Sequence, residues 1–86
     1  MQTFRKTLFL QKIKALMPDL AAVKITDCKY SIYRFSEWLE LEYGNYYYVF
    51  YHAKRWHDRI TYRKSYFNAF AGKRMAPHIL GKLQVN

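Results

Sequence analysis

The segment 39–52 constrains the fold of this chain more than any other. Leucine and tyrosine alternate with glutamate over residues 39–43, which is the pattern of a strand with one buried face. Gly44 and Asn45 follow, and both accept the backbone angles of a tight turn more readily than most residues. Residues 46–52 are then almost entirely aromatic or β-branched, as strands favour. The segment therefore predicts a β-hairpin.

A short helix is the alternative for the first strand of this hairpin. Ser36 is a favourable N-cap, and Glu37 and Trp38 with the leucines that follow are compatible with a helical turn. Gly44 would then end the helix. We favour the hairpin, and the helix stays open as an alternative.

Residues 4–17 predict an amphipathic helix at the start of the chain. Phe9, Ile13 and Leu16 recur on one face at helical spacing, whereas the basic residues lie off that face. Pro18 is expected to end the helix. We interpret it as a helix that packs on the core with a solvated basic back, rather than as a helix that lies on a membrane surface.

The other segments predict further strands and a second helix. Apolar residues alternate in two short stretches before Tyr33 and Phe35 shift the phase, which indicates a bulge or a break between two strands. Residues 60–62 are expected to add a short strand. A helix is expected over residues 65–71, and Pro77 would prevent its continuation. The fold class is therefore α+β, with an N-terminal helix, an antiparallel sheet of three to four strands and a C-terminal helix.

Length and cysteine content limit the class of protein. The chain has room for one small basic domain, residues 1–86. Cys28 is the only cysteine, so no intrachain disulfide is possible and a cytoplasmic location is expected. Lys12 and Lys14 interrupt the first apolar run, so we expect no cleavable signal. The longest uncharged run, 43–53, is too short to span a membrane.

The charge is large and unevenly distributed. The net charge is +9, from 15 lysines and arginines against six acidic residues. Residues 1–36 carry seven basic and two acidic groups, and residues 53–86 carry eight basic groups and one aspartate. Residues 37–52 carry three glutamates and no lysine or arginine. If the two ends fold together, they predict a cationic face that attracts a polyanion.

The densest basic cluster follows the hairpin and is interleaved with aromatic residues. Arginine and lysine bind phosphates, and flat rings stack on bases, so the cluster predicts a nucleic-acid surface. The alternative is that the rings are core residues and the cations only keep a loop solvated. The residues predicted to bind nucleic acid are Lys54, Arg55, Trp56, His57, Arg59, Tyr62, Arg63, Lys64, Lys73 and Arg74.

The tyrosine-rich run 46–51 must divide between two sheet faces, because strand side chains alternate. We expect Tyr47, Val49 and Tyr51 to face the core. The other set would then form a protein interface or a homodimer seam, unless a helix buries it. This predicted interface consists of Tyr46, Tyr48 and Phe50.

No sequence motif identifies an enzyme, a metal site or a cofactor. A metal-independent ribonuclease that uses Arg55, His57, Arg59 and Tyr62 is the least favoured hypothesis. The leading hypothesis is a small accessory protein that binds DNA or RNA. The alternative is a protein-binding inhibitor or adaptor, of the kind that phages and mobile elements use, that acts on a larger partner complex.

Overall fold

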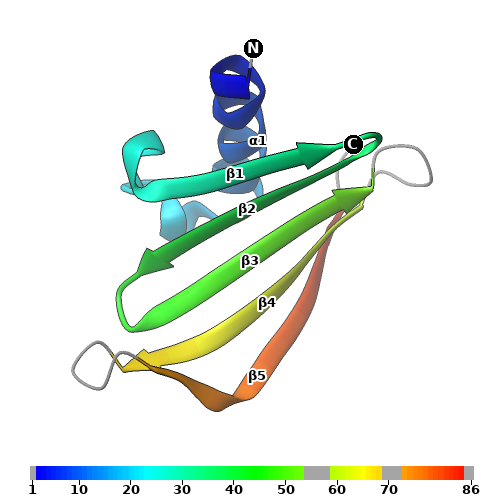
Figure 1. Cartoon of the computed structure of the whole chain (residues 1–86). Coiled ribbons are helices and arrows are strands. Elements are labelled where there is room, and N and C mark those ends of the chain that lie inside the picture. Colours follow the sequence, from blue (N-terminus) through cyan, green and yellow to red (C-terminus); the bar gives the residue numbers. More distant parts are fainter. Residues whose placement is uncertain (1, 54–58, 69–72, 85–86) are drawn as a thin grey trace.

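A computed structural model of the chain describes residues 2–53, 59–68 and 73–84 (Figure 1). One helix precedes five antiparallel strands, which pair in the order in which they occur along the chain. The elements are α1 (Gln2–Leu16), the short 3-10 helices η1 (Pro18–Leu20) and η2 (Ile25–Asp27), and the strands β1 (Cys28–Tyr33), β2 (Ser36–Tyr43), β3 (Tyr46–Ala53), β4 (Arg59–Asn68) and β5 (Lys73–Gln84).

The predicted N-terminal helix is confirmed, with α1 ending at Leu16 just before Pro18. Its apolar stripe packs against the sheet, and Phe9 and Ile13 are fully buried. Leu16 differs from the prediction because it lies at the end of the helix and is exposed. Burial of this stripe stabilises α1, because isolated helices of this length are only marginally stable in water.

The predicted hairpin is also confirmed, and the helix considered for its first half is wrong. β2 and β3 are joined by Gly44 and Asn45, with Tyr43 directly opposite Tyr46. Gly44 has a φ of +63°, and a positive φ at the first of two turn residues is typical of a type II′ turn.

The phase shift after Tyr33 is caused by a second tight turn, which joins β1 to β2. Tyr33 and Ser36 are directly opposite each other, so Arg34 and Phe35 form the whole turn. Arg34 adopts a φ of 55°, a left-handed conformation that costs a residue with a Cβ about 1–2 kcal/mol.

The predicted C-terminal helix is wrong, and the sheet has five strands rather than three to four. Residues 65–68 continue β4, and the rest of the expected helix, residues 69–71, lies outside the described residues. Pairing with β3 on one side and β5 on the other outweighs the weak helix-start signal at Ser65.

Pro77 belongs to β5 instead of ending a helix. Ser65 pairs with His78 and Tyr66 pairs with Met75, so the register shifts between these two pairs. Proline is tolerated in edge strands and at bulges because no ladder hydrogen bond is required of its nitrogen there. The irregularity therefore lets the edge strand β5 run through a proline.

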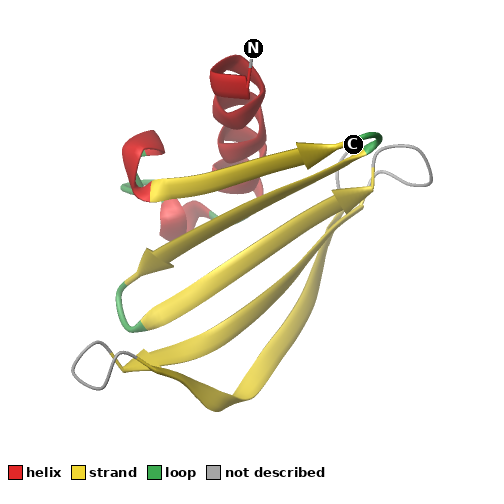
Figure 2. Ribbon diagram, in the orientation of Figure 1, coloured by secondary structure: helices red, strands yellow, loops and turns green. Residues whose placement is uncertain are grey.

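The hydrophobic core lies between α1 and one face of the sheet. In Figure 2 the helical segments gather beside β1 and behind the sheet, and none lies in front of β3, β4 or β5. We call the face that α1 covers the covered face and the opposite one the open face. The buried core residues are Phe9, Leu10, Ile13, Leu20, Val23, Cys28, Leu39, Leu41, Tyr48, Phe50 and Ile60. In the described part of the chain, no helix is long and apolar enough to cross a membrane.

Candidate nucleic-acid interface

The predicted basic cluster is divided by the alternation of β4. Tyr62 lies opposite Phe50 and Lys64 opposite Tyr48, so both side chains are on the covered face. Arg63 lies between them in the sequence and is therefore on the open face, with Arg59. Neighbouring residues of β4 therefore lie on opposite faces of the sheet, and the predicted basic cluster does not form one surface.

Six of the predicted nucleic-acid contacts have no described side chain. Residues 54–57, which include Trp56 and His57, lie outside the described residues, and their role stays a prediction. Lys73 and Arg74 begin β5, where the backbone pairs them with Asn68 and Phe67.

Tyr62 and Lys64 take part in packing on the covered face. The Tyr62 ring centroid lies 5.7 Å from that of Phe50. The Lys64 ammonium lies 4.1 Å from the ring centroid of Tyr46 and 5.5 Å from that of Tyr48. These are cation–π distances, and the contacts hold Lys64 against the aromatic part of the sheet.

The two sets of the tyrosine-rich run face the opposite way from the prediction. Phe50 is 0% exposed and Tyr48 is 4% exposed, and their rings stack at 8° in the core. Tyr46 packs partly buried against the same cluster. This set is therefore not an exposed row, and Tyr47, Val49 and Tyr51 lie on the open face instead. Val49 and Tyr51 are partly exposed there, whereas Tyr47 is buried, as expected, with 8% of its surface exposed.

The two-residue turn between β2 and β3 already indicates which set of the tyrosine-rich run is buried. A two-residue turn at Gly44 and Asn45 places Leu39 opposite Phe50 and Leu41 opposite Tyr48. Residues directly opposite in a hairpin share a face, so burial of the leucines implies burial of Phe50 and Tyr48.

Trp38 and Tyr51 form an aromatic pair on the open face. They are directly opposite on β2 and β3, with ring centroids 5.0 Å apart and an angle of 50° between the rings. The Tyr51 hydroxyl is 3.1 Å from the Ser36 hydroxyl, which fixes the ring at its outer end. Both rings are partly exposed. Sequence reasoning missed Trp38, although its alternation with the buried Leu39 places it on this face.

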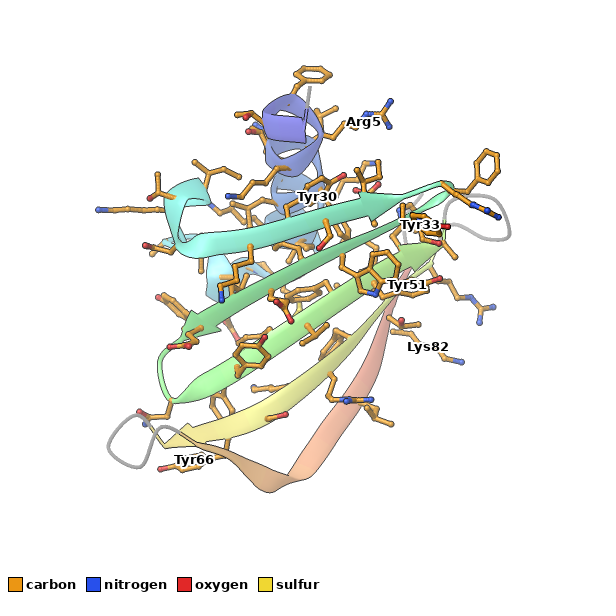
Figure 3. All side chains as sticks on the ribbon, in the orientation of Figure 1. Arg5, Tyr30, Tyr33, Tyr51, Tyr66 and Lys82 are labelled. Atoms are coloured by element: carbon orange, nitrogen blue, oxygen red, sulfur yellow. The ribbon has the colours of Figure 1, made fainter. Side chains whose placement is uncertain are left out.

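The pair lies in a groove of about 520 Å³ on the open face. Arg63 and Lys82 are exposed and line the groove on the β4 and β5 side. Lys82 is opposite Thr61, which is opposite Tyr51, so the lysine and the ring belong to one row across the sheet. Figure 3 shows Tyr51 and Lys82 near the same end of the sheet, far from Tyr66.

The opposite side of the open face is acidic. Glu40 and Glu42 project from β2 beside a second depression of about 440 Å³, which Asp27 and Lys29 also line. Glu40 is opposite Val49, and Val49 is opposite Arg63. The open face therefore changes from acidic at β2 to basic at β4 and β5.

The chain matches no known family. No protein-family model matches it, and no curated protein or solved structure is significantly similar to it.

The ribonuclease hypothesis gains no support from this geometry. Arg59 is on the open face and Tyr62 is on the covered face, so these two side chains do not converge on one substrate. Arg55 and His57 lie outside the described residues. Within the described residues, no three histidine, cysteine or acidic side chains group closely enough to hold a metal ion.

A polar cluster lies under α1 on the covered face. Glu37 and His52 are directly opposite on β2 and β3 and are 2% and 4% exposed. The Tyr30 hydroxyl donates to Glu37 Oε1 at 3.4 Å. Burial, followed by the charge and hydrogen bond of Glu37, raises the pKa of Tyr30 to about 12, while Arg5 opposes this increase.

Tyr30 is expected to make the protein less stable in alkali. The unfolded chain loses the phenol proton near its ordinary pKa of about 10, whereas the folded chain keeps it to about pH 12. The contribution is therefore complete below about pH 10 and is lost as the pH rises from there. The urea midpoint should fall more between about pH 9 and pH 11 in the wild type than in Tyr30→Phe. Equal falls in the two proteins would show that Tyr30 does not carry this dependence.

Proposed function

We propose that this protein binds nucleic acid through the open face of its sheet. The observation that carries the proposal is the partly exposed Trp38–Tyr51 pair beside the exposed cations Arg63 and Lys82. Base stacking on aromatic side chains contributes about 1–3 kcal/mol per base, and neighbouring cations bind the phosphates. The open face offers both kinds of contact in one groove.

The overall charge supports the same proposal. A net charge of +9 on 86 residues steers polyanions toward the protein and speeds their association. On the covered face, Phe9, Tyr48 and Phe50 are buried in the core, while Tyr46 and the exposed Tyr66 pack against each other. The groove on the open face combines partly exposed rings with exposed cations, which favours it as the place where bases bind.

Removing the two groove cations should weaken binding more than removing two other cations. We expect Arg63→Gln with Lys82→Gln to lose about tenfold or more in affinity at low salt, because two phosphate contacts are lost. Each lost contact should also reduce the slope of log affinity against log salt concentration by about 0.7–0.9. Lys12→Gln with Lys24→Gln is the matched control, since both lysines are exposed and distant from the groove. Fluorescence anisotropy of a labelled oligonucleotide at two salt concentrations measures both effects.

Two results would contradict the proposal. If both pairs of substitutions weakened binding equally, only the net charge would matter and the groove would have no special role. If the wild type bound no more tightly than an unrelated protein of similar charge, the protein would have no nucleic-acid site.

A protein-binding adaptor is the second candidate, and the β1–β2 turn favours it. Tyr33 and Phe35 are 63% and 57% exposed, and the Arg34 guanidinium lies 5.2 Å from the Tyr33 ring centroid. Tyrosine and arginine are common among the residues that dominate binding energy in protein interfaces. A stoichiometric partner that stays bound at high salt to the wild type, but not to Tyr33→Ser with Phe35→Ser, would favour this function.

A further inference from the structure

We infer that the groove takes a single strand, with its bases on Trp38 and Tyr51 and its phosphates over β4 and β5. This inference rests on the proposed nucleic-acid function. It adds the class of nucleic acid and the strands over which its bases and its phosphates lie. Three observations on the open face support it: the exposed ring surfaces, the distribution of charge and the size of the groove.

The aromatic pair selects bases whose faces are free. Trp38 and Tyr51 stand on neighbouring strands and are partly exposed, so they offer ring surfaces rather than hydrogen-bonding edges. In a duplex both faces of an internal base are covered by its neighbours, and only base edges are accessible in the grooves. A single strand can unstack a base and place it on a ring.

The distribution of charge on the open face disfavours a duplex, because a duplex has two sugar–phosphate backbones. Adjacent strands lie about 4.8 Å apart, so the β2 side of the open face is about 10–15 Å from the β4 and β5 side. The backbones of a duplex flank a major groove about 12 Å wide. With one backbone on Arg63 and Lys82, the other would lie over Glu40 and Glu42. Like charges repel there, whereas a single strand carries phosphates on one side only.

The groove is the size of a small-ligand site. Its volume of about 520 Å³ lies within the range of about 300–1,000 Å³ that is usual for small-molecule pockets. Such a volume suits one or two nucleotides with their bases turned into the groove. The backbone can then continue along Arg63 and Lys82, which are exposed on β4 and β5.

Three labelled ligands of equal length test the inference: oligo-dT, the same strand with abasic sites in place of the bases, and a duplex. We expect the wild type to bind oligo-dT about tenfold or more tightly than the abasic strand, since stacking requires bases. The duplex should also bind more weakly than oligo-dT. Trp38→Leu should remove the advantage of oligo-dT and leave the abasic strand nearly unaffected.

A second variant tests the charge argument through a gain of affinity, which loss of folding cannot produce. Glu40→Gln with Glu42→Gln removes the negative charge from the β2 side, so the affinity for the duplex should rise relative to that for oligo-dT. An unfolded variant would not gain affinity in this selective way. An unchanged ratio would show that the glutamates do not exclude a duplex and would overturn the charge argument.

The outcomes distinguish failure of the inference from failure of the proposed function. If the abasic strand and the duplex bind as tightly as oligo-dT, and binding still depends on Arg63 and Lys82, the single-strand inference is wrong and the nucleic-acid function stands. If no ligand binds in a way that depends on these two cations, the proposed function itself is wrong.

Discussion

Replacing Phe50 with alanine is expected to lower the free energy of unfolding by about 3–5 kcal/mol. Phe50 is fully buried, stacks on Tyr48 with ring centroids 5.8 Å apart, and also contacts the Tyr62 ring. The substitution leaves a cavity between α1 and the sheet that such a small core cannot close. The total stability of a domain this small is about 5–10 kcal/mol, so much of it would be lost. Urea denaturation measures the change.

Val49→Ala is the matched control, because Val49 precedes Phe50 on the same strand and is partly exposed on the open face. Its cost should be about 1 kcal/mol or less. If Val49→Ala were the more costly of the two, the faces of β3 would be assigned the wrong way round.

Gly81→Ala is expected to cost about 2–3 kcal/mol, although alanine is a small residue. Gly81 lies directly opposite Tyr62, and a Cβ at position 81 would overlap the Tyr62 ring. The tyrosine lies across the glycine, so the added carbon forces either the ring or β5 to move. The movement also disturbs the contact between Tyr62 and Phe50. The change appears as a lower urea midpoint for Gly81→Ala than for the wild type.

The same substitution in a Tyr62→Ala background separates this contact from other effects of residue 81. Without the ring, alanine at position 81 should cost almost nothing, because glycine itself weakens a strand. The double-mutant cycle should therefore give a coupling energy of about 2 kcal/mol. An equal cost in both backgrounds would mean that the overlap with Tyr62 is not the cause.

The first half of the fold could be predicted from local patterns. The apolar stripe that includes Phe9 and Ile13 predicts α1, and Gly44 and Asn45 predict the hairpin, because each signal lies within a few residues of its effect. The second half depends on pairing between distant residues. Ser65 carries a helix-start signal, but Tyr47 lies opposite it on β3 and His78 opposite it on β5. These contacts decide the structure, and no local pattern shows them.

The residue types of the candidate site could be predicted from the sequence, but most of the residues that form it could not. Cations beside aromatic rings were expected after the hairpin, and Arg63 does lie in the groove. The ring pair of the groove comes from β2 and β3 instead, because a sheet joins residues across strands rather than along them. Trp38 and Tyr51 are 13 positions apart in the sequence and become neighbours only through the hairpin register. Lys82 reaches the groove only through the pairing of β4 with β5.

Photo-cross-linking of a halouracil-substituted single strand tests most directly whether nucleic acid lies on the open face. Halogenated uracils react preferentially with aromatic side chains in contact with the base. Mass spectrometry of the digested complex should therefore find the nucleotide on Trp38 or Tyr51. Cross-links on α1 or elsewhere, with none on β2 or β3, would contradict the assignment of the open face as the binding surface.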